Sequence, residues 1–184
     1  MGQLLETITP ALAAWIGEQH VFFVATAPLS GSGHVNTSPK GLDCLRITGP
    51  RQAAYLDLTG SGAETIAHLR ENGRIVLMFC AFAGPPKIVR LHGRGRVVTR
   101  TSPDWADWSS RFPPMAAPRS VIVVDVTRVS DSCGYGVPAM DFKADRDVLA
   151  RWASTQGAEA TAAYRVEKNA TSIDGLPALD AREA

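Results

Sequence analysis

Six short runs of apolar, β-branched and aromatic residues lie between residues 20 and 129, and most are joined by short turns. Runs of this length and composition are typical of β-strands. They cover residues 20–26, 34–38, 53–58, 74–82, 88–98 and 120–129. Because too few helices separate them for a doubly wound βαβ sheet, their order predicts a mainly β, α+β fold: a six-stranded antiparallel barrel with peripheral helices.

Helices are expected around this barrel. Thr9 and Pro10 form an N-cap followed by proline at the first helical position, which predicts a helix from Pro10 to about Glu18. Further helices are expected at 63–71, 145–156 and 158–168, and residues 172–177 are expected to be extended. Within the run 88–98, Gly93 and Gly95 predict a β-bulge or a sharp bend of the barrel.

The length of 184 residues fits one domain. We expect a single domain over residues 1–184, with the barrel core at about 20–130 and the C-terminal helices and tail at about 144–184.

Charge and composition narrow the possible partners. The formal net charge is +1, with no basic excess of the kind that binds nucleic acid. No run approaches the ~18 apolar residues of a membrane span. The N-terminus lacks the features of a signal peptide, and the three cysteines form no CxxC pair. A cytoplasmic protein that binds neither nucleic acid nor membranes is therefore expected.

The segment 55–69 reads as a strand, a Gly60-Ser61-Gly62 turn and a helix. A helix N-terminus offers free backbone N–H groups and a partial positive charge, and glycines let a phosphate approach the backbone. Ser61 and Thr65 would add hydroxyl donors. The same residues also fit a capping box between Ser61 and Glu64, which needs no ligand. Both interpretations remain open at this level.

Lys40 is a candidate cation for such a phosphate. It follows Ser38 and Pro39, and because proline cannot donate to a ladder, this segment is expected at a sheet edge or strand exit. Ser38 and Lys40 would share a face of a regular strand. The alternative is a solvated lysine at an exposed strand end.

The histidines and serines form no recognised catalytic or metal-binding pattern. No Asp or Glu stands at triad or metal-site spacing around His34, His68 or His92, so no metal site is predicted and each histidine is expected to be exposed or hydrogen-bonded. The glycine pairs at 60–62 and 93–95 lack the third glycine of a dinucleotide-binding fingerprint. Tyr135 lies in a glycine-rich loop where it would stack on a planar ligand, and the neighbouring Cys133 is expected to be buried.

The ordered set of motifs resembles the pyridoxamine 5′-phosphate oxidase-related FMN-binding split-barrel family, including an oxidase-like subgroup. The resemblance spans about residues 21–129. It rests on the segments 22–27, 33–41, 55–69, 74–79 and 93–98, and it is supported by the loop 132–138 and the tail 168–177.

The resemblance implies a split barrel and a homodimer with FMN at the subunit interface. The matched positions in the flavin-lining strand are Thr37, Ser38, Pro39 and Lys40, and those in the phosphate turn are Ser61, Gly62 and Thr65. His92 and Tyr135 are candidates for the substrate side. The family's authentic oxidases carry an arginine-rich second strand, a Ser-Arg-Lys turn and a C-terminal substrate motif that are absent here, so oxidation of pyridoxamine phosphate itself is not expected.

The resulting hypothesis is an FMN-dependent oxidoreductase acting on an unidentified small molecule, with hydride or electron transfer at the flavin. One alternative is a non-catalytic flavin or haem binding or sensor protein, for which His92 and His34 would be the candidate haem ligands. Another is an F420-dependent reductase on the same barrel.

Overall fold

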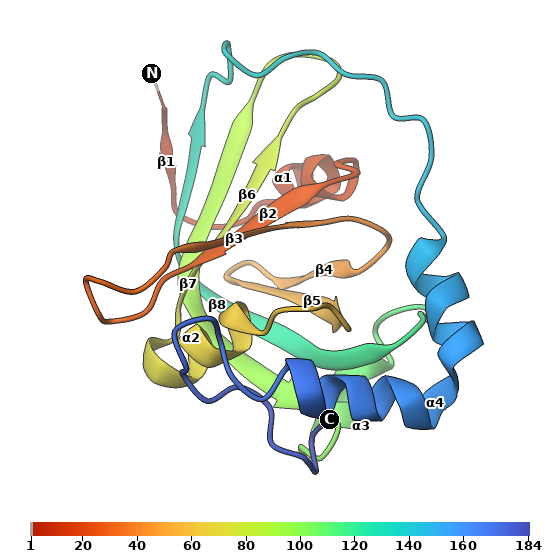
Figure 1. Cartoon of the computed structure of the whole chain (residues 1–184). Coiled ribbons are helices and arrows are strands. Elements are labelled where there is room, and N and C mark those ends of the chain that lie inside the picture. The colour runs from red at the N-terminus through yellow and green to blue at the C-terminus, as the bar shows by residue number, and fades with distance from the viewer. Residues whose placement is uncertain (1) are drawn as a thin grey trace.

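The computed structural model describes residues 2–184, which form eight strands and four helices (Figure 1). The strands are β1 (Leu4–Leu5), β2 (Phe22–Thr26), β3 (Asn36–Lys40), β4 (Leu45–Gly49), β5 (Gln52–Leu58), β6 (Arg74–Cys80), β7 (Ile88–Thr99) and β8 (Pro118–Ser132). The helices are α1 (Pro10–Gly17), α2 (Glu64–Asn72), α3 (Trp105–Ser109) and α4 (Val148–Lys168). No helix in this described part of the chain is long and apolar enough to cross a membrane.

The strands form one antiparallel sheet in the order β3-β2-β6-β7-β8-β5-β4, and β1 pairs with β8. The sheet curls so strongly that β3, the first strand of this order, and β5, the next to last, come close together in front of β7 and β8 (Figure 1). The predicted class, a mainly β antiparallel barrel with peripheral helices, is confirmed. The six expected strands correspond to β2, β3, β5, β6, β7 and β8.

The sequence did not predict β1 and β4, so the expected number of six strands was wrong. β1 has only two residues, too few to show a periodicity. β4 has the sequence Leu-Arg-Ile-Thr-Gly, and all five of its residues are half-buried, so no alternation of apolar and polar residues marks it. Its register comes from pairing with β5, a contact that local sequence does not show.

The predicted irregularity at Gly93 is confirmed by a shift of the β7–β8 register between His92 and Gly93. A Cβ atom at Gly93 would lie 2.3 Å from the backbone oxygen of Asp125 on β8. A Cβ atom at Gly95 would lie 2.7 Å from Leu69 of α2. Both glycines therefore permit close packing, the first between two strands and the second between the sheet and a helix.

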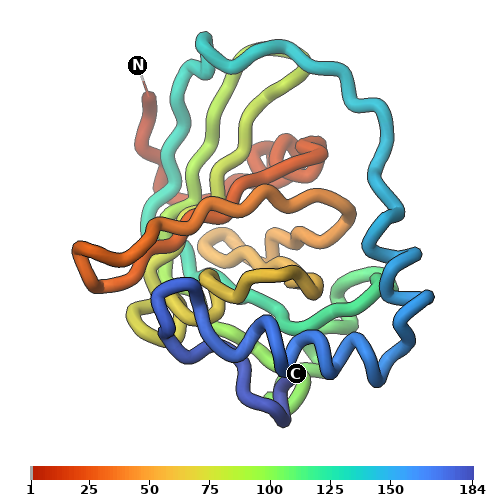
Figure 2. The backbone as a smooth tube through the Cα atoms, viewed as in Figure 1, coloured from red at the N-terminus to blue at the C-terminus, as the bar shows by residue number. Residues whose placement is uncertain are grey.

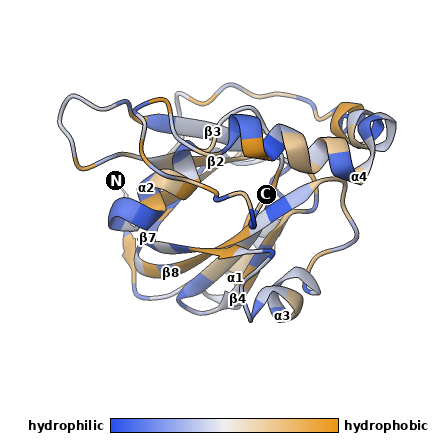
Figure 3. Ribbon diagram, turned by 60° about the horizontal axis from the view of Figure 1, so that its bottom comes forward, coloured by the Kyte–Doolittle hydropathy of each residue, from blue (hydrophilic) through white to orange (hydrophobic). Residues whose placement is uncertain are grey.

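The core fills the curled sheet with aliphatic and aromatic side chains. Tyr55, Phe79 and Leu77 are among its largest fully buried residues. Strand β8 carries a central apolar run, residues 121–124, whereas α2 and α4 also carry hydrophilic residues (Figure 3). Helix α1 contributes Ile16 to this core and begins as predicted, with the Thr9 hydroxyl accepting a hydrogen bond from the backbone N–H of Leu12.

The C-terminal part leaves the barrel after β8, crosses in an extended segment and returns as α4 (Figures 1 and 2). The two helices expected on either side of Gly157 form one element, interrupted at that residue by a non-helical backbone conformation. The tail then passes beside α2, where the backbone N–H of Ile173 donates to Glu64. Residues 172–177 form a tight loop closed by a hydrogen bond from Ser172 N to Leu176 O, so the expectation of an extended segment was wrong.

Candidate functional site

Strand β3 presents two different faces. Asn36, Ser38 and Lys40 are half-buried, whereas Thr37 and Pro39 between them are exposed. The Ser38 hydroxyl donates to the side-chain oxygen of Asn36. This confirms the expectation that Ser38 and Lys40 share a face. As the first strand in the sheet order, β3 also has one backbone edge without a partner strand among residues 2–184.

The ammonium group of Lys40 is held by a buried carboxylate rather than left in solvent. Its Nζ lies 2.9 Å from Asp57 Oδ1, and the other carboxylate oxygen accepts a 2.6 Å hydrogen bond from Arg119 Nε. Burial alone would raise the pKa of Asp57, but the positive charges and hydrogen bonds of Arg119 and Lys40 outweigh it and lower this pKa to about 2. Asp57 is thus the ionised link between β3, β5 and β8.

Asp57 and Arg119 are site residues that the sequence analysis missed. A signal was present for Asp57, because it is the one charged residue in the otherwise largely apolar run 53–58. A buried carboxylate requires a charged or hydrogen-bonding partner. The sequence does not predict which residue is that partner, because Arg119 lies 62 residues further along the chain.

The turn at residues 59–62 is bound by groups from β8 and from the C-terminal end of α4. Arg119 Nη1 donates to the carbonyl oxygen of Gly62 at 2.7 Å, and the side-chain amide of Asn169 donates to that of Gly60 at 2.9 Å. Ser61 is exposed between these two contacts. The C-terminal helix therefore lies directly against the turn that was expected to bind phosphate.

The capping box, which was the alternative interpretation of this turn, does not form. Helix α2 begins at Glu64 after Ala63, and no side chain caps it. The carboxylate of Glu64 instead accepts a hydrogen bond from the backbone of Ile173. A Cβ atom at Gly62 would lie 2.3 Å from Glu64 Oε2, so a larger residue would displace this side chain.

Thr65 faces the interior. Its buried hydroxyl accepts a 3.0 Å hydrogen bond from the side chain of Asn36, which joins α2 to β3. Next to it, His68 Nδ1 lies 2.9 Å from the Thr26 hydroxyl, and burial lowers the pKa of this histidine. His68 is therefore a hydrogen-bonded core residue, one of the two environments expected for it.

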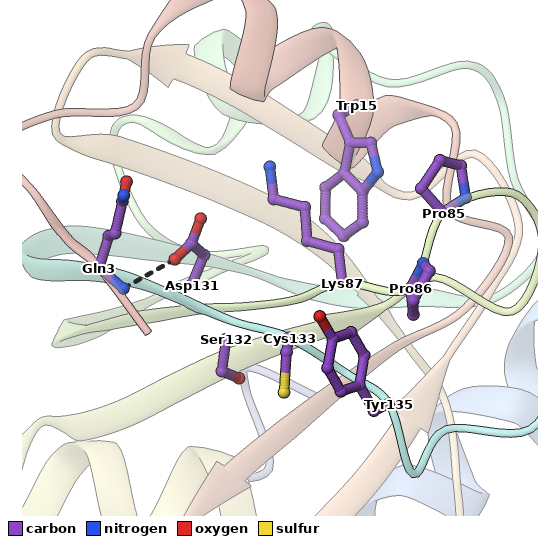
Figure 4. Close-up of a pocket in the computed structure, with 9 residues that line it drawn as sticks. All are labelled: Gln3, Trp15, Pro85, Pro86, Lys87, Asp131, Ser132, Cys133 and Tyr135. Carbon is purple, nitrogen blue, oxygen red and sulfur yellow. Dashed lines mark hydrogen bonds between the residues drawn. The ribbon is translucent and has the colours of Figure 1, made fainter. Parts of the chain in front are cut away.

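The two residues expected on the substrate side line separate cavities. His92 borders one of about 250 Å³ together with Thr26 and Arg74. Tyr135 borders another of about 530 Å³ with Trp15 and Lys87 (Figure 4). Within one chain, the structure does not bring His92 and Tyr135 together.

His34, Cys44 and Cys133 lie in three different environments. His34 Nδ1 lies 2.6 Å from a carboxylate oxygen of Asp174 in the tail. Burial raises the pKa of the Cys44 thiol to about 12. Cys133 is exposed beside the cavity of Figure 4, so the expectation that it is buried was wrong; the glycine-rich loop that carries it lies on the surface. In residues 2–184, no group of three or more His, Cys, Asp or Glu side chains is placed to hold a metal ion.

Comparison with known proteins identifies the family to which this chain is related. A family model described as pyridoxamine 5′-phosphate oxidase matches residues 8–133. A relative described as pyridoxamine 5′-phosphate oxidase family protein ustO, from Aspergillus flavus, is 38% identical over 191 residues, covering 95% of this chain and 76% of the relative.

Solved structures show the same fold at lower identity. HupZ from Group A Streptococcus matches with a TM-score of 0.53 and 23% identity over 66% of this chain and 91% of HupZ. A candidate pyridoxamine 5′-phosphate oxidase from Lactobacillus delbrueckii matches with a TM-score of 0.52 and 15% identity over 69% of this chain and 98% of that one. The family match and the curated relative agree with the resemblance found in the sequence, and the chain belongs to the pyridoxamine 5′-phosphate oxidase family.

Proposed function

We propose that this protein is a homodimeric, FMN-dependent oxidoreductase acting on a small molecule. The observation that carries the proposal is the excess of positive charge around the turn at residues 59–62 in a member of this family. Arg119 and Arg165 contact this turn, and Lys40 lies nearby on Asp57. Two carboxylates stand against these three cations: Asp57, which binds Lys40 and Arg119, and Glu64, which lies beside Gly62. This arrangement of cations favours the binding of an anionic group such as the phosphate of FMN.

The residues at the edge of the sheet suit the flavin ring. β3 has a free backbone edge within residues 2–184, and its exposed Thr37 and Pro39 flank the half-buried Ser38. Unpaired N–H and C=O groups of an edge strand can bind a planar heterocycle that carries both donors and acceptors. We assign the ring to Thr37, Ser38 and Pro39.

The phosphate end is assigned to Ser61, the backbone at Gly62 and the ammonium group of Lys40. Ser61 is exposed and therefore free to donate its hydroxyl. Lys40 is oriented by Asp57 and retains 20% of its side-chain exposure. Thr65 supports this end indirectly, because its hydroxyl is already bonded to Asn36 of the flavin-lining strand.

Bound FMN would supply hydride or electron transfer to a small molecule. The chain's own residues would hold and orient the cofactor. His92 and Tyr135 remain proposed substrate-side residues, and a homodimer would place the cofactor between two copies. His92 and Tyr135 line different cavities of one chain, so a single chain does not form one substrate site from both. A flavin or haem binding protein without turnover is therefore the second candidate function.

The decisive experiment is an absorbance spectrum of the purified protein together with mass identification of any bound molecule. We expect FMN to be present, or to bind on incubation, and a mass in solution of twice 19.7 kDa. Steady-state oxidation of NADH or NADPH through the flavin would separate an enzyme from a carrier. A colourless protein that gains no flavin absorbance with added FMN would rule out the proposal, and bound F420 or haem would replace its cofactor.

A double variant tests the proposed phosphate end. Lys40→Ala combined with Ser61→Ala should weaken FMN binding by about tenfold or more, since it removes a charged and a neutral donor. The matched control is Lys143→Ala combined with Ser110→Ala, both exposed residues in other segments. Unchanged affinity in the first pair would move the phosphate site elsewhere.

A further inference from the structure

Arg165, in the last turn of α4, is a buried cation without a counter-ion in the described part of the chain. Only 4% of the residue is exposed, and its Nη1 donates a 3.2 Å hydrogen bond to the neutral hydroxyl of Thr59. Its Nε is buried and has no hydrogen-bond partner within residues 2–184. No acidic side chain of that range forms an ion pair with it. An uncompensated buried charge is strongly unfavourable, so this arrangement needs a negative partner.

The neighbouring charges increase this imbalance. Burial lowers the pKa of Arg165, and the positive charges of Arg100 and Arg119 lower it further. Asp57 offers no relief, because Lys40 and Arg119 already occupy its two oxygens. The C-terminal end of α4 carries a partial negative charge of about half an electron, which offsets only part of the positive charge of these arginines.

The arginines meet at the turn that precedes α2. Thr59, at its start, contacts Arg165, and Gly62, at its end, contacts Arg119. Ser61 lies exposed between them, and the first turn of α2 has no side-chain cap within residues 2–184. Hydroxyl, backbone N–H and guanidinium donors are thus gathered at one short segment, a donor set that suits a phosphate group.

We propose that Arg165, together with Arg119 and Ser61, binds a phosphate group, so that the C-terminal helix completes the anion site at the 59–62 turn. The phosphate belongs either to FMN, in which case the inference rests on the proposed function, or to free phosphate. Arg165 lies outside residues 8–133 matched by the family model and is contributed by the C-terminal part of the chain.

The first experiment measures thermal stability with inorganic phosphate against chloride at equal ionic strength. The wild-type melting temperature should rise with phosphate in a saturable way, and Arg165→Gln should abolish this response. Arg151→Gln is the matched control, because Arg151 lies on the same helix with 70% of its side chain exposed. A phosphate response in Arg165→Gln equal to that of the wild type would overturn the inference.

The second experiment compares FMN with riboflavin, which lacks the phosphate. Arg165→Gln should weaken FMN binding by about 10- to 100-fold, as expected for loss of hydrogen bonds to a charged group, and leave riboflavin binding within about twofold. Equal losses for both ligands would show a merely structural role. If Arg165→Gln fails to fold, Arg165→Lys keeps the charge but removes Nε and the planar fork, and an intermediate loss for FMN alone is expected.

The outcomes also separate this inference from the proposed function. Phosphate stabilisation through Arg165 without any flavin binding would keep the anion site and reject FMN. Tight FMN binding that is unaffected in Arg165→Gln would keep the proposed function and reject the role of Arg165.

Discussion

Lys40 and Asp57 form an ion pair of 2.9 Å in which the carboxylate is fully buried and the ammonium group is partly exposed. Arg119 binds the other oxygen of the same carboxylate from β8. Asp57 therefore joins the edge strand β3 to the interior of the barrel and holds the cationic groups of Lys40 and Arg119 in place. The arrangement makes the geometry of the candidate site depend on one negative charge.

Removing that charge should destabilise the protein. In Asp57→Asn, the buried guanidinium of Arg119 loses its ionic partner, and the free energy of unfolding should fall by about 3–5 kcal/mol. Urea denaturation at pH 7 measures the loss. Asp43→Asn removes a mainly exposed partner of Arg46 and should change stability by less than about 1 kcal/mol. Similar effects of the two substitutions would contradict the structural role of Asp57.

The same carboxylate predicts a dependence of stability on acid. Its pKa is about 2 in the folded protein and 3.8 as a free side chain, so the unfolded chain binds more protons between these values. The stabilisation is present above pH 4 and is lost as the pH falls towards 2, by about 2 kcal/mol in total. Comparing unfolding free energies of the wild type and Asp57→Asn from pH 5 to 2 isolates this contribution. A constant difference between the two proteins over that range would refute it.

His68 should titrate below the ordinary range of histidine. Burial disfavours its charged form, and the Thr26 hydroxyl lies 2.9 Å from Nδ1. Because the folded state resists protonation of this ring, its contribution to stability is present above about pH 6.5 and decreases as the pH falls below that value. NMR titration of the imidazole protons tests this directly. A His68 pKa at or above about 6.5 would contradict this prediction, because burial would then not outweigh the charges of Asp174, Glu64 and Glu71, which raise the pKa.

The sequence reveals local elements of this molecule better than it reveals their partners. Thr9 and Pro10 predict the start of α1 because a cap acts over three residues. Ser61 and Glu64 fit a capping box equally well, yet Glu64 binds the tail at Ile173, a competitor 109 residues away. The contacts of Arg165 and Arg119 with the 59–62 turn likewise join residues that are far apart in the chain. Such contacts arise from the curling of the sheet and the return of α4, neither of which has a local signature.

Gly93 should not tolerate a side chain. Its Cβ would lie 2.3 Å from the backbone oxygen of Asp125, and this backbone atom cannot move without shifting β8. Gly93→Ala should therefore reduce the free energy of unfolding by about 1–3 kcal/mol. Gly31→Ala is the control, since its Cβ would have no atom within 4 Å, and it should be neutral or slightly stabilising. Equal stability of both variants in urea would show that the bulge can rearrange.

Gly157 should be required for the course of α4. Its backbone has φ 78° and ψ 172°, a region used almost only by glycine, and it turns the helix so that the rings of Trp152 and Tyr164 pack 5.2 Å apart. In a continuous helix these residues, twelve positions apart, would be separated by about 18 Å along the axis. Gly157→Ala should cost about 1–3 kcal/mol, either as backbone strain or because the helix straightens and separates the two rings. Near-UV circular dichroism and urea denaturation distinguish the two, because only straightening alters the environment of Trp152. Gly136→Ala, at an unstrained glycine with open space around it, should leave both signals unchanged, and a Gly157→Ala variant as stable as the wild type would contradict the turn seen at this residue.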